Sequence, residues 1–156
     1  MYDEFGIPFV AGAPFGENNT EELLLMLSQA ARGNEMPEKA AAESVGEEVL
    51  YVGEQFLGNA IRAYLAGKGY NVTVTSLYDM DKSYMRAGDK KLNSEDELAQ
   101  IAEGKAVVIA DPDCRGAVKG EVKWIRLPNS GMSIIEPVLP VDMIGSRLET
   151  WLDGQM

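Results

Sequence analysis

The chain has 156 residues, of which 46% are hydrophobic, and its formal net charge is −11. This length and composition suit one domain, or one domain with a fragment of another, and they exclude a disordered tail. The acidic balance, without clustered Lys and Arg, argues against nucleic acid and disfavours anionic membranes, and no apolar run approaches the roughly 20 residues of a membrane span.

The first 45 residues predict a short strand, a helix and a linker. The apolar residues 7–10 form the expected strand, and prolines and glycines follow it. Asn19 or Thr20 is the expected N-cap of a helix over TEELLLMLSQAARG, and Gly33 is its expected stop. The polar, Ala-rich stretch that follows is typical of a linker with a helical segment from about residue 38 to residue 44.

From residue 48 onward, β-type and helix-type patterns alternate. Strands are expected at 48–53, 70–78, 105–110 and 121–128, and helices within 54–69, 94–104 and 141–152. Ser94 and Glu97 have capping-box spacing. The charge run from Asp79 to Lys91 is expected as a solvated loop, in which Tyr84, Met85 and Arg86 could alternatively contact a partner.

This order of elements predicts an α/β fold: an open, mostly parallel sheet with helices on both faces, a Rossmann- or flavodoxin-like three-layer domain. Loops that follow the strands gather at one edge of such a sheet, and ligands usually bind there. The candidate loops are residues 53–56, 77–80, 111–116 and 129–133.

The chemistry available to these loops is narrow, because histidine is absent and Cys114 is the single cysteine. The sequence therefore excludes a His general base, a Ser-His-Asp triad and a four-cysteine zinc or iron–sulfur site within one chain. We expect no cofactor in the isolated chain. A lone cysteine, together with an N-terminus that lacks the pattern of a signal peptide, favours a cytoplasmic protein.

Three short motifs lie on the candidate loops. GEQFLG (53–58) is neither G-x-G-x-x-G nor a P-loop, Glu54 would repel a phosphate, and a plain strand-to-helix turn is the favoured interpretation. In DPDCRG (111–116), Arg115 could lower the pKa of the Cys114 thiol, or the segment could be a turn with Cys114 packed beneath it. LPNSGMS (127–133) could bind a ligand or make only its own turn bonds.

Four consecutive stretches of the sequence carry a resemblance. The first stretch is similar to the pattern yGiP, P-x-G and T-x-x-(F/L)-L, and it reads FGIPFVAGAPFGENNTEELLLMLSQAARG. The second is similar to the order strand, helix, L-x-x-x-G, strand, and it reads EEVLYVGEQFLGNAIRAYLAGKGYNVTV. The third stretch is similar to an S-x-x-E-L helix followed by a vvigd strand, and it reads NSEDELAQIAEGKAVVIADPDCRG. The fourth is similar to the strand that carries a late pocket loop, and it reads EVKWIRLPNSG. In this order they resemble the C-terminal domain of the nitrogenase component 1 family, which includes molybdenum–iron protein subunits, cofactor-assembly scaffolds and dark-operative chlorophyll-pathway reductases.

The resemblance implies that residues 1–35 end a preceding domain and that residues 36–156 form an α/β component 1-like domain. Such a domain would help to wall a metal-cluster or tetrapyrrole-type pocket, and it would be inactive alone. The residues expected to contact the shared ligand are Glu54, Gln55, Asp111, Cys114, Arg115, Asn129 and Ser130. In several members of the family the late loop carries a histidine near the metal cofactor, whereas here Asn129 lies near the expected place, and an amide is a poor substitute for imidazole as a metal ligand.

The resemblance also implies partners. These are a second component 1-type subunit and an ATP-dependent iron–sulfur reductase, with an iron–sulfur or related metal cluster in the full-length complex. The alternatives are a non-catalytic scaffold domain in metallocofactor assembly and an unrelated flavodoxin-like module that binds a small anion or flavin. A hydrophobic surface around Phe5, Ile7 and Phe9 would favour a homodimer of the fragment.

Overall fold

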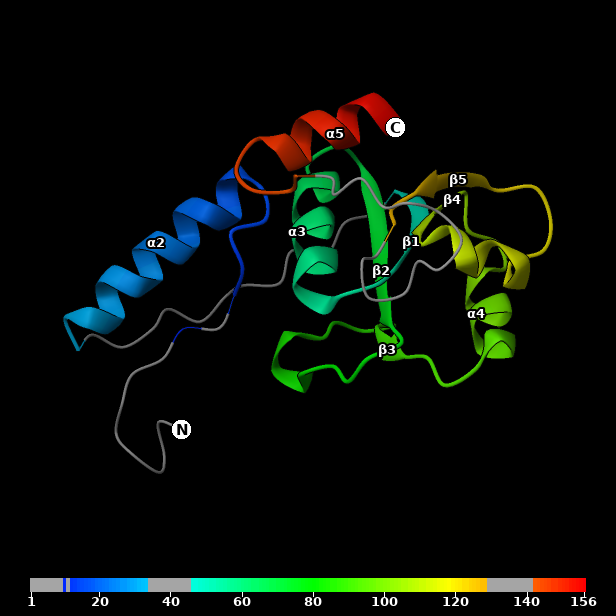
Figure 1. Ribbon diagram of the computed structural model, residues 1–156, viewed down its shortest axis with the longest axis horizontal. Helices are drawn as coiled ribbons and strands as arrows, with labels where there is room; N and C mark the ends of the chain where they lie inside the picture. Colours follow the sequence, from blue (N-terminus) through cyan, green and yellow to red (C-terminus); the bar gives the residue numbers. More distant parts are fainter. Residues whose placement is uncertain (1–9, 11, 34–45, 129–141) are drawn as a thin grey trace. The chain divides into compact units, whose positions relative to one another are not determined.

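The computed structural model describes residue 10 and residues 12–33, 46–128 and 142–156. The chain divides into two compact units, whose helices and strands are labelled in Figure 1. The terminal unit is Met1–Ala41 with Asp142–Met156, and the sheet unit is Ala42–Val141. The predicted division into residues 1–35 and 36–156 stays a prediction, because compactness alone does not identify the domains of a longer protein.

The sheet unit is built on a parallel sheet whose described strands have the order β3-β2-β1-β4-β5. Its strands are β1 (Glu47–Val52), β2 (Tyr70–Ser76), β3 (Lys90–Lys91), β4 (Val107–Ala110) and β5 (Lys123–Arg126). The chain builds outward from β1 to β3 and then returns to add β4 and β5 on the other side of β1. The sheet unit therefore has the predicted Rossmann-like α/β fold, and its strand order reverses between β1 and β4.

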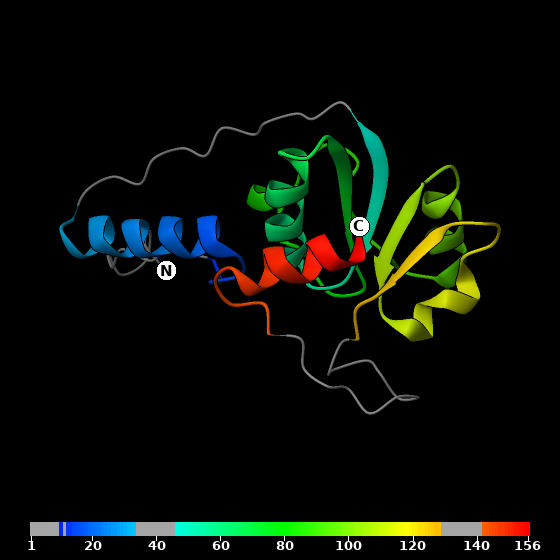
Figure 2. The ribbon, with the colours of Figure 1, turned by 90° about the horizontal axis from the view of Figure 1, so that it is seen from above.

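Helices cover both faces of this sheet. The helix α3 (Gln55–Ala66) lies against the face that carries Tyr51 and Val74, because a Cβ atom added at Gly58 would lie 2.6 Å from the Tyr51 ring and 2.7 Å from Val74. The opposite face packs against α4 (Glu95–Ala102) and the 3-10 helix η2 (Pro112–Ala117). Figure 2 shows α3 and α4 on opposite sides of the strands.

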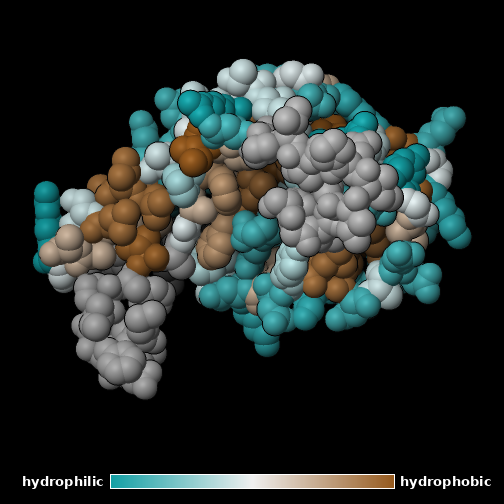
Figure 3. All heavy atoms as spheres, in the orientation of Figure 1, coloured by the Kyte–Doolittle hydropathy of each residue, from teal (hydrophilic) through white to brown (hydrophobic). Residues whose placement is uncertain are grey.

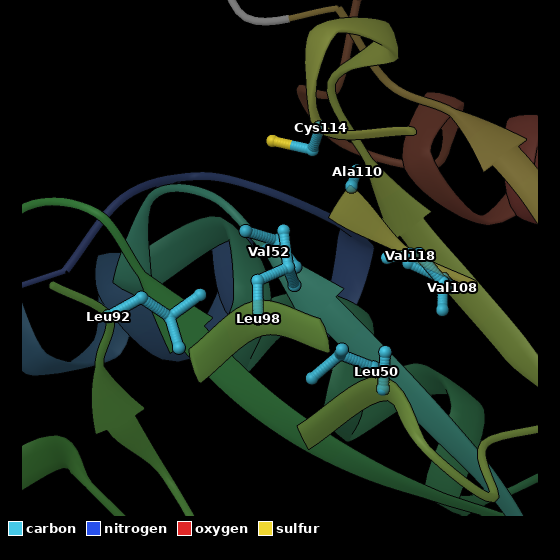
Figure 4. Packing of buried hydrophobic residues seen from close by; sticks show 9 residues of the cluster. Leu50, Val52, Leu92, Leu98, Val108, Ala110, Cys114 and Val118 are labelled. Carbon is cyan, nitrogen blue, oxygen red and sulfur yellow. The ribbon is translucent and has the colours of Figure 1, made fainter. Parts of the chain in front are cut away.

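The core explains why the strands were predictable. All four residues of β4 are buried, as are the last four of β1, so both faces of these strands exclude water. Figure 4 shows the cluster on the α4 face, where Leu50 and Val52 of β1 meet Leu98 of α4 and Val108 of β4. Burial of a side chain such as Leu50 stabilises the fold by about 2 kcal/mol.

The terminal unit contains α2 (Glu17–Ala31) and α5 (Arg147–Gln155). The prediction that Asn19 or Thr20 caps α2 is wrong, because the helix begins three residues before Thr20, with Gly16 as N-cap. The Thr20 hydroxyl donates to the Gly16 carbonyl instead, and the Glu17 N–H donates to Glu149 Oε1 of α5 at 2.8 Å. A distant carboxylate thus takes the place of a local cap.

The other boundaries follow the sequence more closely. Ser94 is confirmed as an N-cap, since its hydroxyl accepts the Glu97 N–H at 3.2 Å, and Gly33 follows the end of α2 with a φ of 70°. The segment after β2, expected as plain loop, contains the 3-10 helix η1 (Lys82–Tyr84) and the two-residue β3. The C-terminal helix, expected from residue 141, begins at Arg147.

Some predictions lie outside the described residues. They concern most of the strand at 7–10, the helical segment at 38–44 and the hydrophobic surface around Phe5, Ile7 and Phe9. In the part of the chain that the structure does describe, no helix combines the length and apolar character needed to span a membrane.

Candidate functional site

The candidate site is the switch-point edge, which we define as residues 53–55 after β1 and residues 111–115 after β4. The two strands pair in parallel, with Val52 beside Ala110, so both segments leave the same edge of the sheet. Because the strand order reverses between β1 and β4, this edge is where open α/β sheets usually bind ligands. The fold therefore brings five of the predicted site residues to one edge: Glu54, Gln55, Asp111, Cys114 and Arg115.

Glu54 occupies the helix N-terminus that a phosphate would need. It is the N-cap of α3, and its carboxylate accepts the Phe56 N–H at 2.9 Å and the Leu57 N–H at 2.8 Å. These amides are the donors that bind phosphates in dinucleotide-binding folds. The carboxylate takes their hydrogen bonds and adds a negative charge, so the first strand-to-helix turn does not favour an anionic ligand.

The glycines of GEQFLG make room for a protein side chain. Tyr51 is 2% exposed, and its ring fills the space above Gly53 and Gly58: added Cβ atoms there would lie 2.4 Å from its hydroxyl and 2.6 Å from its ring. In dinucleotide-binding proteins comparable glycines admit the pyrophosphate. Burial, and then the charge of Glu54, raise the pKa of the Tyr51 hydroxyl, which stays neutral.

Gln55 holds the loop after β2. Its side-chain amide donates to the Asp81 carbonyl at 2.9 Å, and its oxygen accepts the Asp81 N–H at 2.8 Å. The side chain is 5% exposed, so both ends of the amide are satisfied inside the protein. Gln55 is thus placed at the predicted edge, but it acts as a structural clamp.

The segment after β4 is a closed turn. Asp111 is 2% exposed and caps η2, with its Oδ1 accepting the Asp113 N–H at 2.9 Å and its carbonyl accepting the Cys114 N–H at 3.0 Å. Cys114 is 8% exposed and belongs to the hydrophobic cluster on the α4 face, as Figure 4 shows. The structure therefore agrees with the second interpretation of DPDCRG, a turn with Cys114 packed beneath it.

The Cys114 thiol is not activated. Burial, followed by the charges of Asp111 and Asp113, raises its pKa to about 11. The hypothesis that Arg115 lowers this pKa is wrong. The Arg115 guanidinium instead donates to the Val118 carbonyl at 2.7 Å and lies 5.5 Å from the centre of the Trp124 ring. At neutral pH the thiol is protonated and is a poor nucleophile and a poor metal ligand.

Two predicted site residues, Asn129 and Ser130, lie outside the described residues. Among the residues that the structure does describe, no three His, Cys, Asp or Glu side chains are grouped so that they could hold a metal ion. The donor set in the described chain therefore does not fit ligation of a metal cluster.

A buried polar anchor that the sequence patterns did not predict joins α3 to the segment between β2 and β3. Arg62 of α3 donates to both carboxylate oxygens of Asp89 at 2.7 Å, and these oxygens also accept the Val74 N–H at 2.9 Å and the Arg86 N–H at 2.8 Å. The side chains of this ion pair are 4% and 1% exposed. The prediction of a solvated charge run is therefore wrong for Asp89, although it holds for the exposed Asp79.

A signal for this anchor exists on α3. Gln55, Asn59 and Arg62 follow one another at helical spacing on a helix whose other inward positions are apolar. Asn59 donates to the Tyr84 carbonyl at 3.2 Å, so all three side chains contact the segment between β2 and β3. A polar row on a mostly buried helix indicates that a loop packs over it.

Comparisons with known proteins add two structural likenesses. No protein-family model and no curated protein matches the chain. The NADPH-dependent glyoxylate/hydroxypyruvate reductase of Sinorhizobium meliloti is 14% identical with a TM-score of 0.33, over 60% of this chain and 45% of that one. The D-mandelate dehydrogenase of Rhodotorula graminis is 14% identical with a TM-score of 0.39, over 88% of this chain and 38% of that one. The chain thus spans less than half of each, and likenesses of this degree carry no inference about function.

Proposed function

We propose that the chain is a non-catalytic α/β domain of a nitrogenase component 1-like oxidoreductase, in which it forms part of the wall of a shared pocket. One observation supports this most: the described polar groups of the switch-point edge are engaged in bonds within the chain. Glu54 caps α3, Gln55 clamps the loop after β2, and Asp111 caps η2. Such an edge offers shape and rigidity to a ligand, while the reacting groups and cluster ligands come from other domains or a second subunit.

The same observation counts against the flavodoxin-like alternative. A flavin or dinucleotide needs uncapped helix N–H groups for its phosphate, and the Glu54 carboxylate occupies them. It also needs space beside the glycines, which the Tyr51 ring fills. The formal net charge of −11 adds a repulsive term for any anionic ligand.

The second candidate is a scaffold domain of the same fold in metallocofactor assembly. The high pKa of Cys114 is compatible with both, because neither asks this chain to ligate the cluster. The two differ in whether the assembled protein reduces a substrate. By resemblance, the proposed partners are a second component 1-type subunit and an ATP-dependent iron–sulfur reductase, in the cytoplasm.

Anaerobic iron analysis and visible spectroscopy test this proposal. The chain alone, incubated with ferrous iron and sulfide and then desalted, is expected to retain no stoichiometric iron. The native complex, captured anaerobically from its source cells with an antibody against this chain, is expected to contain iron and a visible chromophore. A colourless, iron-free complex would refute the oxidoreductase proposal, and a stoichiometric cluster on the chain alone would refute the wall role.

A further inference from the structure

One face of α2 carries exposed leucines. Leu24, Leu25 and Leu27 are 62%, 56% and 49% exposed, and hydrophobic side chains gather over α2 in Figure 3. The helix is not exposed all round, since Ala30 is 8% exposed. Exposed leucines grouped on one helix are typical of a surface that binds another protein.

The spacing of this face matches a helix–helix seam. Thr20, Leu24, Leu27 and Ala31 follow one another at intervals of four, three and four residues. At 3.6 residues per turn these positions fall within about 60° of the helix circumference, as in the a and d positions of a heptad. Leu25 lies at the side of the seam.

Charge decides the direction in which a second α2 would run. The acidic residues Glu17 and Glu21 are in the first half of the helix, and Arg32 is its C-cap. In a parallel pair Glu21 would face Glu21 and Arg32 would face Arg32. In an antiparallel pair centred between Leu25 and Met26, each Glu21 comes within reach of the Arg32 of the other copy.

We propose that this leucine face of α2 binds the same face of a second copy of the chain, with the two helices antiparallel. Leu24 of one copy then packs against Leu27 of the other, and Glu21 pairs with Arg32 at both ends of the seam. The start of α2 is joined to α5 by the bond from its Glu17 N–H to Glu149.

The length of α2 limits the area that the two copies can bury. A 15-residue helix is about 22 Å long, and two such helices bury less than the roughly 800 Å² per partner of a standard interface. Interfaces below this size are mostly transient, so the dimer is expected to dissociate on dilution.

Sedimentation equilibrium over a range of concentrations tests this proposal with matched variants. The wild-type chain is expected to dimerise, and Leu24→Ser with Leu27→Ser is expected to weaken the dimer by at least about tenfold. The control is Ile144→Ser, because Ile144 is 57% exposed in the same unit but lies outside α2. This control is expected to leave the dimer unchanged.

Charge reversal tests the direction. Glu21→Arg and Arg32→Glu are each expected to weaken the dimer, and the double variant is expected to restore it. A wild-type chain that stays monomeric at high concentration overturns the proposal. If the leucine substitutions then lower the unfolding temperature of the monomer, the face is covered by this chain itself. A dimer that survives the leucine substitutions overturns the proposal too, and so does one that the Ile144 control weakens equally.

Discussion

Replacement of Asp89 by asparagine is the sharpest test of how α3 and β2 hold the segment that leads into β3. The carboxylate accepts bonds from the Arg62 guanidinium and from the N–H groups of Val74 and Arg86. Asparagine keeps the size of the side chain, but it removes the charge and replaces one accepting oxygen with a donor. The Arg62 side chain, 4% exposed, would then be a buried charge without its counter-ion.

The expected cost is large for a domain of this size. Loss of one partner from a buried ion pair destabilises proteins by about 3–5 kcal/mol. The whole free energy of unfolding of a typical domain is about 5–15 kcal/mol. Urea unfolding followed by circular dichroism should therefore show a midpoint that falls by a large fraction in Asp89→Asn.

A control in the same segment makes this prediction specific. Asp79 is also a carboxylate paired with a cation, Lys91, but its side chain is 95% exposed. Asp79→Asn should leave the urea midpoint almost unchanged. If Asp89→Asn fails to fold, the double variant Arg62→Met with Asp89→Asn should recover folding, because it removes the orphaned charge. Equal midpoints for the Asp79 and Asp89 variants would refute the assignment of an anchoring role.

Three further predictions concern residues at or near the sheet. Gly58→Ala should lower the free energy of unfolding by about 1–3 kcal/mol in urea titrations, because the added Cβ would lie 2.6 Å from the Tyr51 ring. A substitution without effect on the urea midpoint would refute the packing of Tyr51 against Gly58. Alkylation of Cys114 by iodoacetamide at pH 8 should be at least roughly 100-fold slower in the folded chain than in urea, because the pKa of the folded thiol is raised to about 11. Equal alkylation rates would contradict the burial of Cys114. Hydrogen bonds from Lys105 and Asn71 lower the pKa of Glu48. The small difference in unfolding free energy between wild type and Lys105→Met should therefore be present at pH 7 and vanish as the pH falls below 4.5. A difference that grew in acid would contradict the Glu48–Lys105 ion pair.

The fold could be predicted from the sequence because its signals are local. The buried strands are read from continuous apolar runs such as Val107–Ala110, and the α4 start from Ser94 with Glu97 three residues later. The position of the site follows from the order of elements alone. Because the strand order reverses between β1 and β4, the loops after them meet at one edge.

The state of the site could not be predicted, because it depends on partners that are distant in sequence. Asp89 can be buried because its carboxylate is bound by Arg62, 27 residues earlier, and by two backbone N–H groups. The first N–H of α2, that of Glu17, is accepted by Glu149, 132 residues away, which local sequence could not indicate. The thiol pKa of Cys114 likewise depends on how deeply the turn buries it, which residue types alone do not reveal.

The proposed function requires that the switch-point edge is closed to phosphate-bearing ligands. The measurement that tests it most directly is a titration of the nitrogen-15-labelled chain with flavin mononucleotide and NADPH, observed through the backbone amides of Phe56 and Leu57. Because the Glu54 carboxylate already accepts both N–H groups, their resonances are expected to stay in place at every ligand concentration. A saturable shift of these two amides would show that the helix N-terminus binds a phosphate, and it would contradict the account.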